Sequence, residues 1–392
     1  MDVKRCRSIF FAIILFGFTF LNTPAANAES ELIPVEAVKQ VVESDIKNIP
    51  PEHEFFGLWN DVEIVHRADL YDIHDHIMGY YFQLMQGNQS IGYYITGARY
   101  DITPILEYSS SPTKDSLESA EADEKLYYFG GGNQAAAVNA NELISQIESE
   151  VNNNNQKMKL QKNNADAFSP TLAEILQSLD LNVEPNSREL WKQSLESDSF
   201  SLKAAPSAYY LAVPSMNQYQ PGVNHSGSAC GPTSLSMVIQ YLHSIGLQVH
   251  DMKTYFNNSE SDMINGMYNF LGTNIFGTSA GNMSFLTPQL LNMHMSGWTA
   301  TNIKGSASGA IASYQDRVIS SRPPLVMWNK PDFFVWLDPD VTWHWQAGNG
   351  YRMTSSGVFE FGAKDPSKNA TTSNYYNWAA NKNYFLFTSY KQ

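Results

Sequence analysis

The sequence has few cysteines, few long hydrophobic runs and little positive charge. Among its 392 residues there are two cysteines, Cys6 and Cys230. Beyond the first thirty residues, no apolar run reaches the length of a membrane helix. Lysine and arginine number 25 against 39 aspartates and glutamates, and they form no basic cluster. These features exclude a disulfide-stapled scaffold and argue against a membrane span and a nucleic-acid partner.

The first thirty residues predict a cleaved signal peptide, 1–28. The apolar run Ile9–Phe20 follows three basic residues and precedes Pro24 and the small residues Ala26, Asn27 and Ala28. A run of about twelve residues is too short to cross a bilayer, whereas it suits the apolar part of a secretory signal. The mature chain is therefore expected to be secreted, extracellular or on the exterior of the cell envelope, with Cys230 as its one thiol.

The charge divides the mature chain into two parts. Residues 29–205 contain 29 acidic and 12 basic residues, a net charge of −17, whereas residues 206–392 contain 9 and 10, a net charge of +1. This asymmetry predicts two modules with different roles. Residues 139–205 are rich in asparagine and glutamine and are interpreted as a polar linker with short helices at 173–181 and 187–195.

The first module, 29–138, is predicted to be a small α+β domain. Apolar residues recur at helical spacing over 33–49. Two strand-like segments, 79–85 and 91–98, flank the turn signal Gly87-Asn88 and predict a hairpin, with a further strand at 102–108.

Cys230 opens a predicted helix in the second module. The apolar residues that follow it trace one helical face until Gly246. The positive end of a helix favours a thiolate, which is the nucleophilic form of cysteine. A lone exported thiol in this setting indicates a reactive cysteine.

From Tyr209 to Gln392 the sequence resembles papain-like cysteine peptidases, and among them the bacteriocin-processing (C-thirty-nine) peptidase-like family. The resemblance rests on four elements in order: Val213-Pro214 with Gln218, Cys230-Gly231-Pro232, His344 with Gly350-Tyr351 six residues on, and Asp365-Pro366. The segment Trp345–Asn349 departs from the family, in which the strand after the histidine is continuously aliphatic.

The resemblance implies an α+β papain-like domain over 206–392, in which a helix carrying Cys230 packs on an antiparallel sheet carrying His344 and Asp365. Cys230 would be the nucleophile, His344 the general base and acid, Asp365 the group that orients the imidazole, and Gln218 an oxyanion donor. Such a site needs an orienting group behind its base and fixed donors for the oxyanion. No cofactor and no metal are expected, and the substrate would be a peptide or protein.

Other histidines offer rival interpretations. His294, with helix-like neighbours, is the alternative to His344 as base. His225 lies on a glycine- and serine-rich loop and is expected to face solvent or substrate, while His243 and His250 are expected to be structural. His74 and His76 invite a metal interpretation, but two histidines without further ligands favour a surface or strand position.

The first module also resembles, over about thirty residues from Phe82 to Tyr108, the propeptide of streptopain-type peptidases. This similarity implies a proenzyme whose N-terminal domain is an intramolecular partner that masks the site. A substrate-binding or surface-attachment domain remains the alternative for this module. For the whole chain, the alternatives are another Cys/His/Asp hydrolase or acyltransferase (a cell-wall amidase or a transglutaminase-like enzyme) and a non-catalytic binding or adhesion protein on a peptidase fold.

Overall fold

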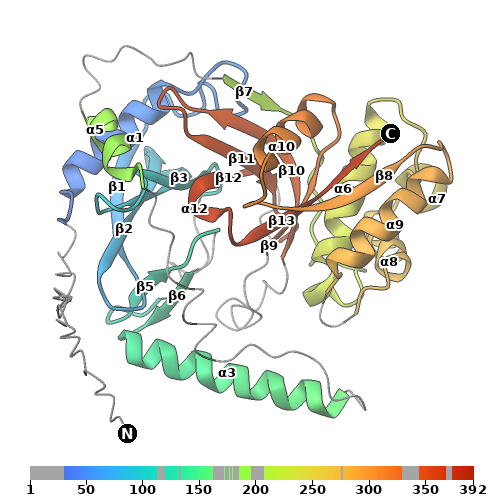
Figure 1. Ribbon diagram of the computed structural model, residues 1–392, viewed down its shortest axis with the longest axis horizontal. Coiled ribbons are helices and arrows are strands. Elements are labelled where there is room, and N and C mark those ends of the chain that lie inside the picture. The colour runs from blue at the N-terminus through green and yellow to red at the C-terminus, as the bar shows by residue number, and fades with distance from the viewer. Residues whose placement is uncertain are drawn as a thin grey trace, which may run out of the picture.

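The computed structural model describes residues 31–112, 120–131, 134–161, 172, 176, 179, 185–195, 207–274, 277–328, 344–367 and 373–392. The predicted signal peptide and the linker helix at 173–181 fall almost entirely outside these residues. The described chain is α+β, with one large and mostly antiparallel sheet (Figure 1).

The N-terminal region contributes one helix and six strands to the described structure. They are α1 (Val35–Lys47), β1 (Glu63–Tyr71), β2 (Ile77–Gln86), β3 (Gln89–Gly97), β4 (Ile105–Ser109), β5 (Lys125–Tyr128) and β6 (Gln134–Ala137). The hairpin and the first helix predicted from the sequence are confirmed as β2–β3 and α1. In α1, the buried residues Val38, Val41 and Val42 repeat at helical spacing and form the face that packs on the core.

Two helices are described between this region and the C-terminal region, α3 (Ala140–Gln161) and α5 (Ser187–Leu195). The α5 helix matches the prediction, whereas α3 is a long helix where a loose linker was expected. Its start is fixed by a capping box: the Asn139 side chain accepts from the Glu142 N–H at 3.0 Å, and the Glu142 carboxylate accepts from the Val138 N–H at 3.1 Å. Leu143 and Ile147 then bury one face of the first turns.

The C-terminal region contains helices on one flank and the rest of the sheet. Its helical elements are η2 (Ser226–Ser228), α6 (Cys230–Ser244), α7 (Met252–Tyr255), α8 (Glu260–Phe270), α9 (Ala280–Asn292), α10 (Ala310–Ile319) and α12 (Trp378–Asn381). Its strands are β7 (Ser207–Tyr210), β8 (Thr299–Lys304), β9 (Leu325–Trp328), β10 (Trp345–Met353), β11 (Phe359–Lys364), β12 (Ser373–Asn377) and β13 (Phe385–Lys391). The helix predicted after Cys230 is confirmed as α6.

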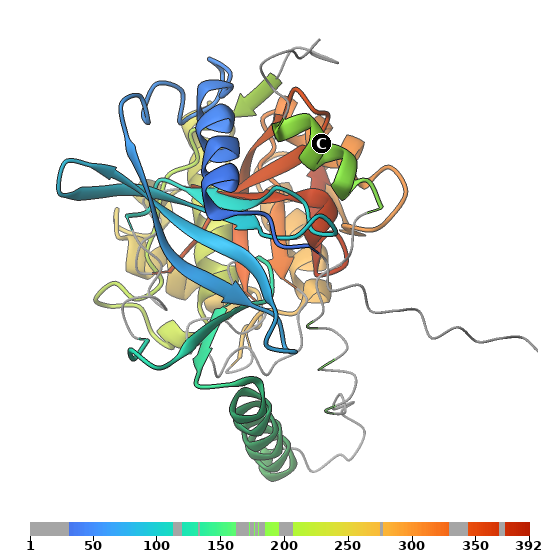
Figure 2. The same ribbon diagram turned by 90° about the vertical axis from the view of Figure 1, so that its left-hand side faces the viewer.

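The sheet runs without interruption through both regions. Among the described strands its order is β6-β5-β1-β2-β3-β4-β12-β11-β10-β9-β13-β8, and β7 pairs with the far part of β10. The two regions meet where β4 pairs antiparallel with β12, with Tyr108 opposite Tyr375 and Glu107 opposite Tyr376. Figures 1 and 2 show β1–β4 continuing the plane of the C-terminal strands, with α3 at the far end beside β5 and β6. The two predicted modules therefore share one sheet.

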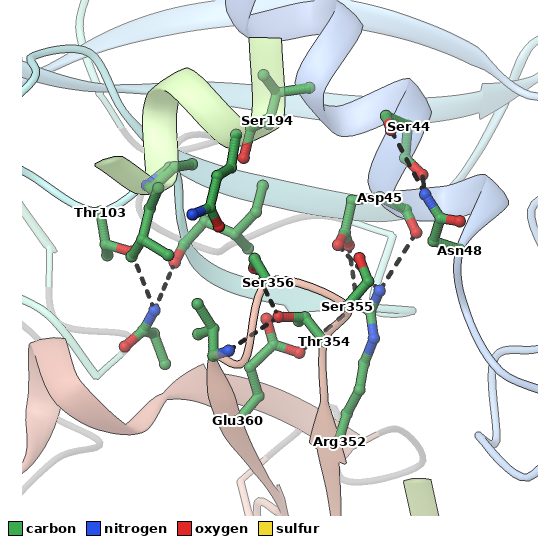
Figure 3. A pocket seen from close by; sticks show the side chains of 17 residues that line it. Ser44, Asp45, Asn48, Thr103, Ser194, Arg352, Thr354, Ser355, Ser356 and Glu360 are labelled. Carbon is green, nitrogen blue, oxygen red and sulfur yellow. Dashed lines mark hydrogen bonds and ion pairs between the residues drawn. The ribbon is translucent and has the colours of Figure 1, made fainter. Parts of the chain in front are cut away.

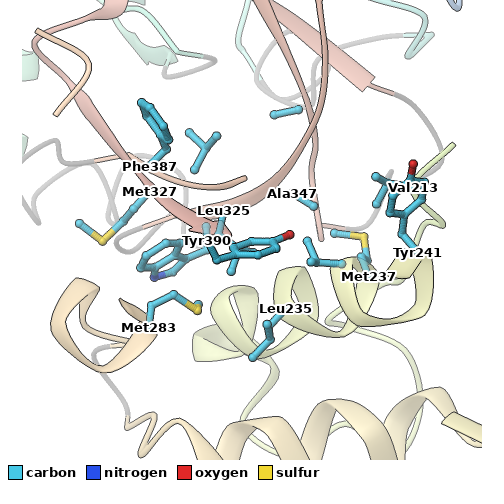
Figure 4. Close-up of a cluster of buried hydrophobic side chains, with 14 of the residues drawn as sticks. Val213, Leu235, Met237, Tyr241, Met283, Leu325, Met327, Ala347, Phe387 and Tyr390 are labelled. Atoms are coloured by element: carbon cyan, nitrogen blue, oxygen red, sulfur yellow. The ribbon is translucent and has the colours of Figure 1, made fainter. Parts of the chain in front are cut away.

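The largest hydrophobic core lies between α6 and the C-terminal strands. Leu235, Met237 and Tyr241 point from α6 toward buried residues of β9, β10 and β13 (Figure 4). Tyr375 of β12 belongs instead to the core under the N-terminal sheet. This exchange of a large side chain across the boundary means that neither region completes its core alone.

A buried ion pair also joins the two regions. The Arg352 guanidinium, 1% exposed, binds both carboxylate oxygens of Asp45 in α1, at 2.8 and 2.9 Å, and lies 3.5 Å from Glu360. The Tyr108 hydroxyl donates to Glu360 at 2.9 Å. Figure 3 shows these side chains beside a pocket of about 300 Å³ that α1, α5 and the β10–β11 turn line.

No helix in the described parts of the chain is long and apolar enough to cross a membrane.

The buried ion pair predicts that Asp45→Ala lowers the free energy of unfolding by about 3 kcal/mol, because it leaves a buried guanidinium short of its main partner. Urea unfolding measures the change. Asp316→Ala is the control: Asp316 is 62% exposed and pairs with Arg317 at the surface, so its loss should cost less than about 1 kcal/mol. Equal losses in the two variants would contradict the structural role of the Asp45–Arg352 pair.

Candidate active site

Cys230 is the first residue of α6 and is 3% exposed. A single 3₁₀ turn, η2, brings the chain into the helix, and the Ser228 hydroxyl in that turn lies 3.0 Å from the Tyr268 hydroxyl. Gly231 follows the cysteine at a point of close approach. A Cβ atom there would lie 2.4 Å from Thr278 Oγ1 and 3.1 Å from the Trp345 ring. Glycine at this position therefore lets the start of α6 lie directly against the beginning of β10.

His344 and Asp365 lie at one end of the β10–β11 hairpin. His344 immediately precedes β10, Asp365 immediately follows β11, and the pairing of Ala347 with Lys364 brings both ends together. His344 Nε2 is 2.6 Å from Asp365 Oδ2. The two residues are 21 positions apart in the sequence, and the hairpin alone accounts for their contact.

Asp365 receives further hydrogen bonds. The Gln346 side-chain amide donates to Oδ2 at 2.6 Å, and the Ser367 backbone N–H donates to Oδ1 at 2.8 Å. Burial alone would raise the pKa of Asp365, but the charge of His344 and these hydrogen bonds lower it to about 2. The carboxylate is therefore ionised throughout the neutral range.

His344 is held in its charged form. Burial alone would lower its pKa, but Asp365 and the Cys230 sulfur raise it to about 10. Nδ1, the ring nitrogen that does not face Asp365, is buried and has no oxygen or nitrogen partner in the described chain. The hydrogen-bonding interaction of the ring with the Cys230 side chain contributes to the raised pKa. The structure thus brings together the three residues that the sequence singled out as nucleophile, base and orienting group.

Gln218 lies beside this trio and is fully buried. Its backbone N–H donates to the Pro366 carbonyl at 2.8 Å, which ties it to the corner after Asp365. Its side-chain amide donates to the Ser226 carbonyl at 2.8 Å, in the turn before Cys230. That bond uses one of the two amide hydrogens and leaves the second for another acceptor. Its service as an oxyanion donor stays a prediction.

The other histidines lie elsewhere. His294 Nε2 is 2.6 Å from His250 Nδ1, and its Nδ1 is 3.5 Å from the Tyr255 hydroxyl, in a partly exposed aromatic cluster. His225 is exposed and stacks on Tyr268 at 5.4 Å. His74 and His76 occupy the exposed turn between β1 and β2. Within the described ranges, no group of three histidine, cysteine, aspartate or glutamate side chains is arranged to hold a metal ion.

The polar segment that departs from the family pattern has a structural explanation. All of Trp345–Asn349 is buried in β10, between neighbouring strands and α6. Its polar side chains are satisfied internally, because Gln346 binds Asp365 and Asn349 donates to the Ser373 hydroxyl at 2.6 Å. The sequence analysis missed Gln346 as a site residue. Its position two residues after His344 was the available signal, since alternate residues of a strand share one face.

Residues 210–392 match the family model described as the Peptidase_C39 like family. This part of the chain belongs to that family. Comparison of the chain with curated proteins gives no match. The resemblance identified from the ordered motifs is therefore confirmed for the C-terminal region. Membership supports a cysteine-peptidase-like function, while the roles of the individual residues stay predictions.

The His344–Asp365 pair predicts a specific dependence of stability on pH. The folded-state pKa of His344 lies above its ordinary value, so its contribution to the free energy of unfolding is complete below about pH 6.5 and disappears as the pH rises through 10. The folded-state pKa of Asp365 is lowered, so its contribution is complete above about pH 4 and disappears as the pH falls through 2. Urea unfolding from pH 5 to 10 measures the alkaline loss. Asp365→Asn should remove most of it, and an unchanged slope would contradict the ion pair.

Proposed function

We propose that the protein is an exported cysteine peptidase, made as a proenzyme, that hydrolyses peptide bonds through Cys230, His344 and Asp365. The observation that carries this proposal is the ion-paired His344, whose ring interacts with a sulfur at the start of a helix. A charged imidazole and the helix N-terminus both favour a thiolate. Family membership of residues 210–392 supports the same chemistry.

The reaction follows from this geometry. The Cys230 thiolate would attack the substrate carbonyl carbon, forming a C–S bond and a tetrahedral oxyanion. The His344 imidazolium would then give its proton to the amine as the C–N bond breaks, which leaves an acyl-enzyme and a neutral imidazole. Water, deprotonated by that imidazole, would attack the acyl carbon, release the acid and restore the thiolate–imidazolium pair. Asp365 would stabilise the imidazolium and fix the orientation of the ring.

Two donors are available for the oxyanion. One is the backbone N–H of Cys230, which points outward at the start of α6 because the first N–H groups of a helix have no partner within it. The other is the remaining hydrogen on the Gln218 amide, whose nitrogen is held in place by Ser226. Donors fixed before the reaction stabilise the developing charge without further reorganisation.

Export and proenzyme formation are parts of the same proposal. The basic and apolar residues before Ala28 support export, with the mature chain beginning near Glu29. Cys230, His344 and Gln218 are each at most 4% exposed, and such burial supports an inactive precursor. The polar stretch within residues 139–205 offers a place for the activating cut, since proteases favour exposed polar connections.

Cys230→Ala is expected to give a folded protein without peptide hydrolysis, because the nucleophile is removed. Its activity on a fluorogenic peptide library is compared with that of His294→Ala, which should stay within about twofold of wild type. A thiol-directed epoxide should label Cys230 alone. Hydrolysis by Cys230→Ala would refute the mechanism, and an acyl-enzyme that reacts only with amines would instead indicate an acyltransferase.

Gln218→Ala should lower kcat by about 10²-fold and leave KM nearly unchanged, as expected when an oxyanion donor is lost. Gln240→Ala in α6, whose partly buried side chain contacts Met263, is the matched control. Steady-state kinetics of both variants provide the measurement. Near-normal kcat in Gln218→Ala would remove this residue from the site.

A further inference from the structure

Gln346 links the candidate site to residues that no motif contains. It is 1% exposed, and its amide nitrogen donates to Asp365 Oδ2 at 2.6 Å, the same oxygen that lies against His344. The same nitrogen is 3.1 Å from the Tyr376 hydroxyl. Its amide oxygen accepts from Trp328 Nε1 at 3.0 Å. Each polar atom of this side chain therefore has a partner.

Trp328 determines which way the Gln346 amide faces. An indole N–H can only donate, so the atom opposite it must be the amide oxygen. The amide nitrogen is then directed at Asp365, where a donor stabilises the carboxylate. A reversed amide would place an oxygen against that carboxylate and would leave the indole N–H without an acceptor. Such an arrangement would be costly in a buried site. Trp328 thus fixes the donor that holds Asp365 against His344.

The N-terminal region contacts Trp328 directly. Gly131, in the turn between β5 and β6, lies so close to the indole that a Cβ atom there would be 2.5 Å from Cζ3 and 2.8 Å from Cε3. The backbone of the N-terminal region therefore forms one wall of the site in which the indole is held. Trp328 is 3% exposed, and the Tyr376 ring packs against it edge-on at 4.9 Å.

The N-terminal region reaches Gln346 by a second route, through Tyr376. Tyr376 in β12 is paired with Glu107 in β4, and the Glu107 carboxylate is fully buried. Glu107 accepts from the Tyr93 and Tyr128 hydroxyls at 2.6 and 3.2 Å. Burial raises the pKa of Tyr376, and the negative charges of Glu107 and Asp365 raise it further. The Tyr376 hydroxyl is therefore a neutral group between two carboxylates, one from each region of the chain.

We propose that the N-terminal region is a permanent part of the active site, which it completes from behind by holding Trp328, Tyr376 and, through them, Gln346 and Asp365. This inference rests on the proposed peptidase function. It assigns Trp328 and Gln346 as positioning residues and Gly131 as the contact that keeps the indole in place. It also gives the activating cut a specific consequence: after cleavage of the linker the N-terminal part stays bound through β4 and β12, and the site needs it there.

The test uses the full chain, assayed intact and after limited proteolysis of the linker. Gly131→Ala introduces a Cβ that must displace the indole. Trp328→Phe removes the N–H that orients Gln346 while keeping an aromatic ring. Each variant should lower kcat by about tenfold or more with little change in KM, because small displacements of a reacting group cost this much. Each should also lower the pKa of His344, followed by NMR of its ring nitrogens, since Asp365 is no longer held against Nε2.

Gly87→Ala is the matched control for Gly131→Ala. Both glycines have a positive φ, +60° at Gly87 and +52° at Gly131, so both substitutions strain the backbone similarly, but nothing lies within 4 Å of a Cβ at position 87. Gly87→Ala should leave kcat and the His344 pKa unchanged. If Gly131→Ala fails to fold, Glu107→Gln is the second N-terminal variant, and it should lower both quantities because it removes a negative charge behind Tyr376.

The outcomes separate three cases. A folded Gly131→Ala with normal kcat and normal His344 pKa would overturn the inference. So would a variant with higher activity than wild type, which would show that the N-terminal region masks the site instead. If wild type and Cys230→Ala are equally inactive on peptides, the proposed function fails. The His344 pKa then still decides the positioning role, because that measurement needs no turnover.

Discussion

The antiparallel pairing of β4 with β12 is the constraint on which the rest of the molecule depends. It converts two sets of strands, separated by more than 250 residues in the sequence, into one sheet. Because cross-strand neighbours share a face, the pairing also places Glu107 beside Tyr376 and Tyr108 beside Tyr375. The first of these pairs leads to the candidate site, and the second builds the N-terminal core. A strand edge that would otherwise be free to pair with other chains is covered in the same step.

At the site, burial and charge act in opposite directions, and their balance determines the chemistry. Burial disfavours the charged form of His344 as well as that of Asp365, yet each is the main reason that the other stays charged. The pair therefore exists only while the separation of 2.6 Å is kept. Gln346 and the Ser367 N–H supply the additional donors that a buried carboxylate requires. Such a site depends on its neighbours, and several of these belong to the N-terminal region.

Local features of this fold could be predicted from the sequence, whereas its long-range pairings could not. The helix after Cys230, the β2–β3 hairpin and α5 follow from spacing, turn residues and apolar periodicity over fewer than twenty residues each. The ordered motifs led to His344 and Asp365, because their residue types carry the chemistry. Trp328 and Gln346 carry no such mark, and their importance appears only once β9, β10 and β11 lie side by side. The β4–β12 pairing likewise has no local signal, since either strand could satisfy its pattern with another partner.

The β10–β11 hairpin is held by the N-terminal region at both of its ends. At the turn end, Arg352 and Glu360 are fixed by Asp45 and Tyr108. At the open end, where His344 and Asp365 meet, Gly131 supports Trp328 and thereby Gln346. A hairpin fixed at one end can still open at the other, and opening here would separate the imidazole from its carboxylate. Support at both ends removes that freedom. The N-terminal region therefore acts on the hairpin that carries the proposed base, which is a different task from covering the nucleophile.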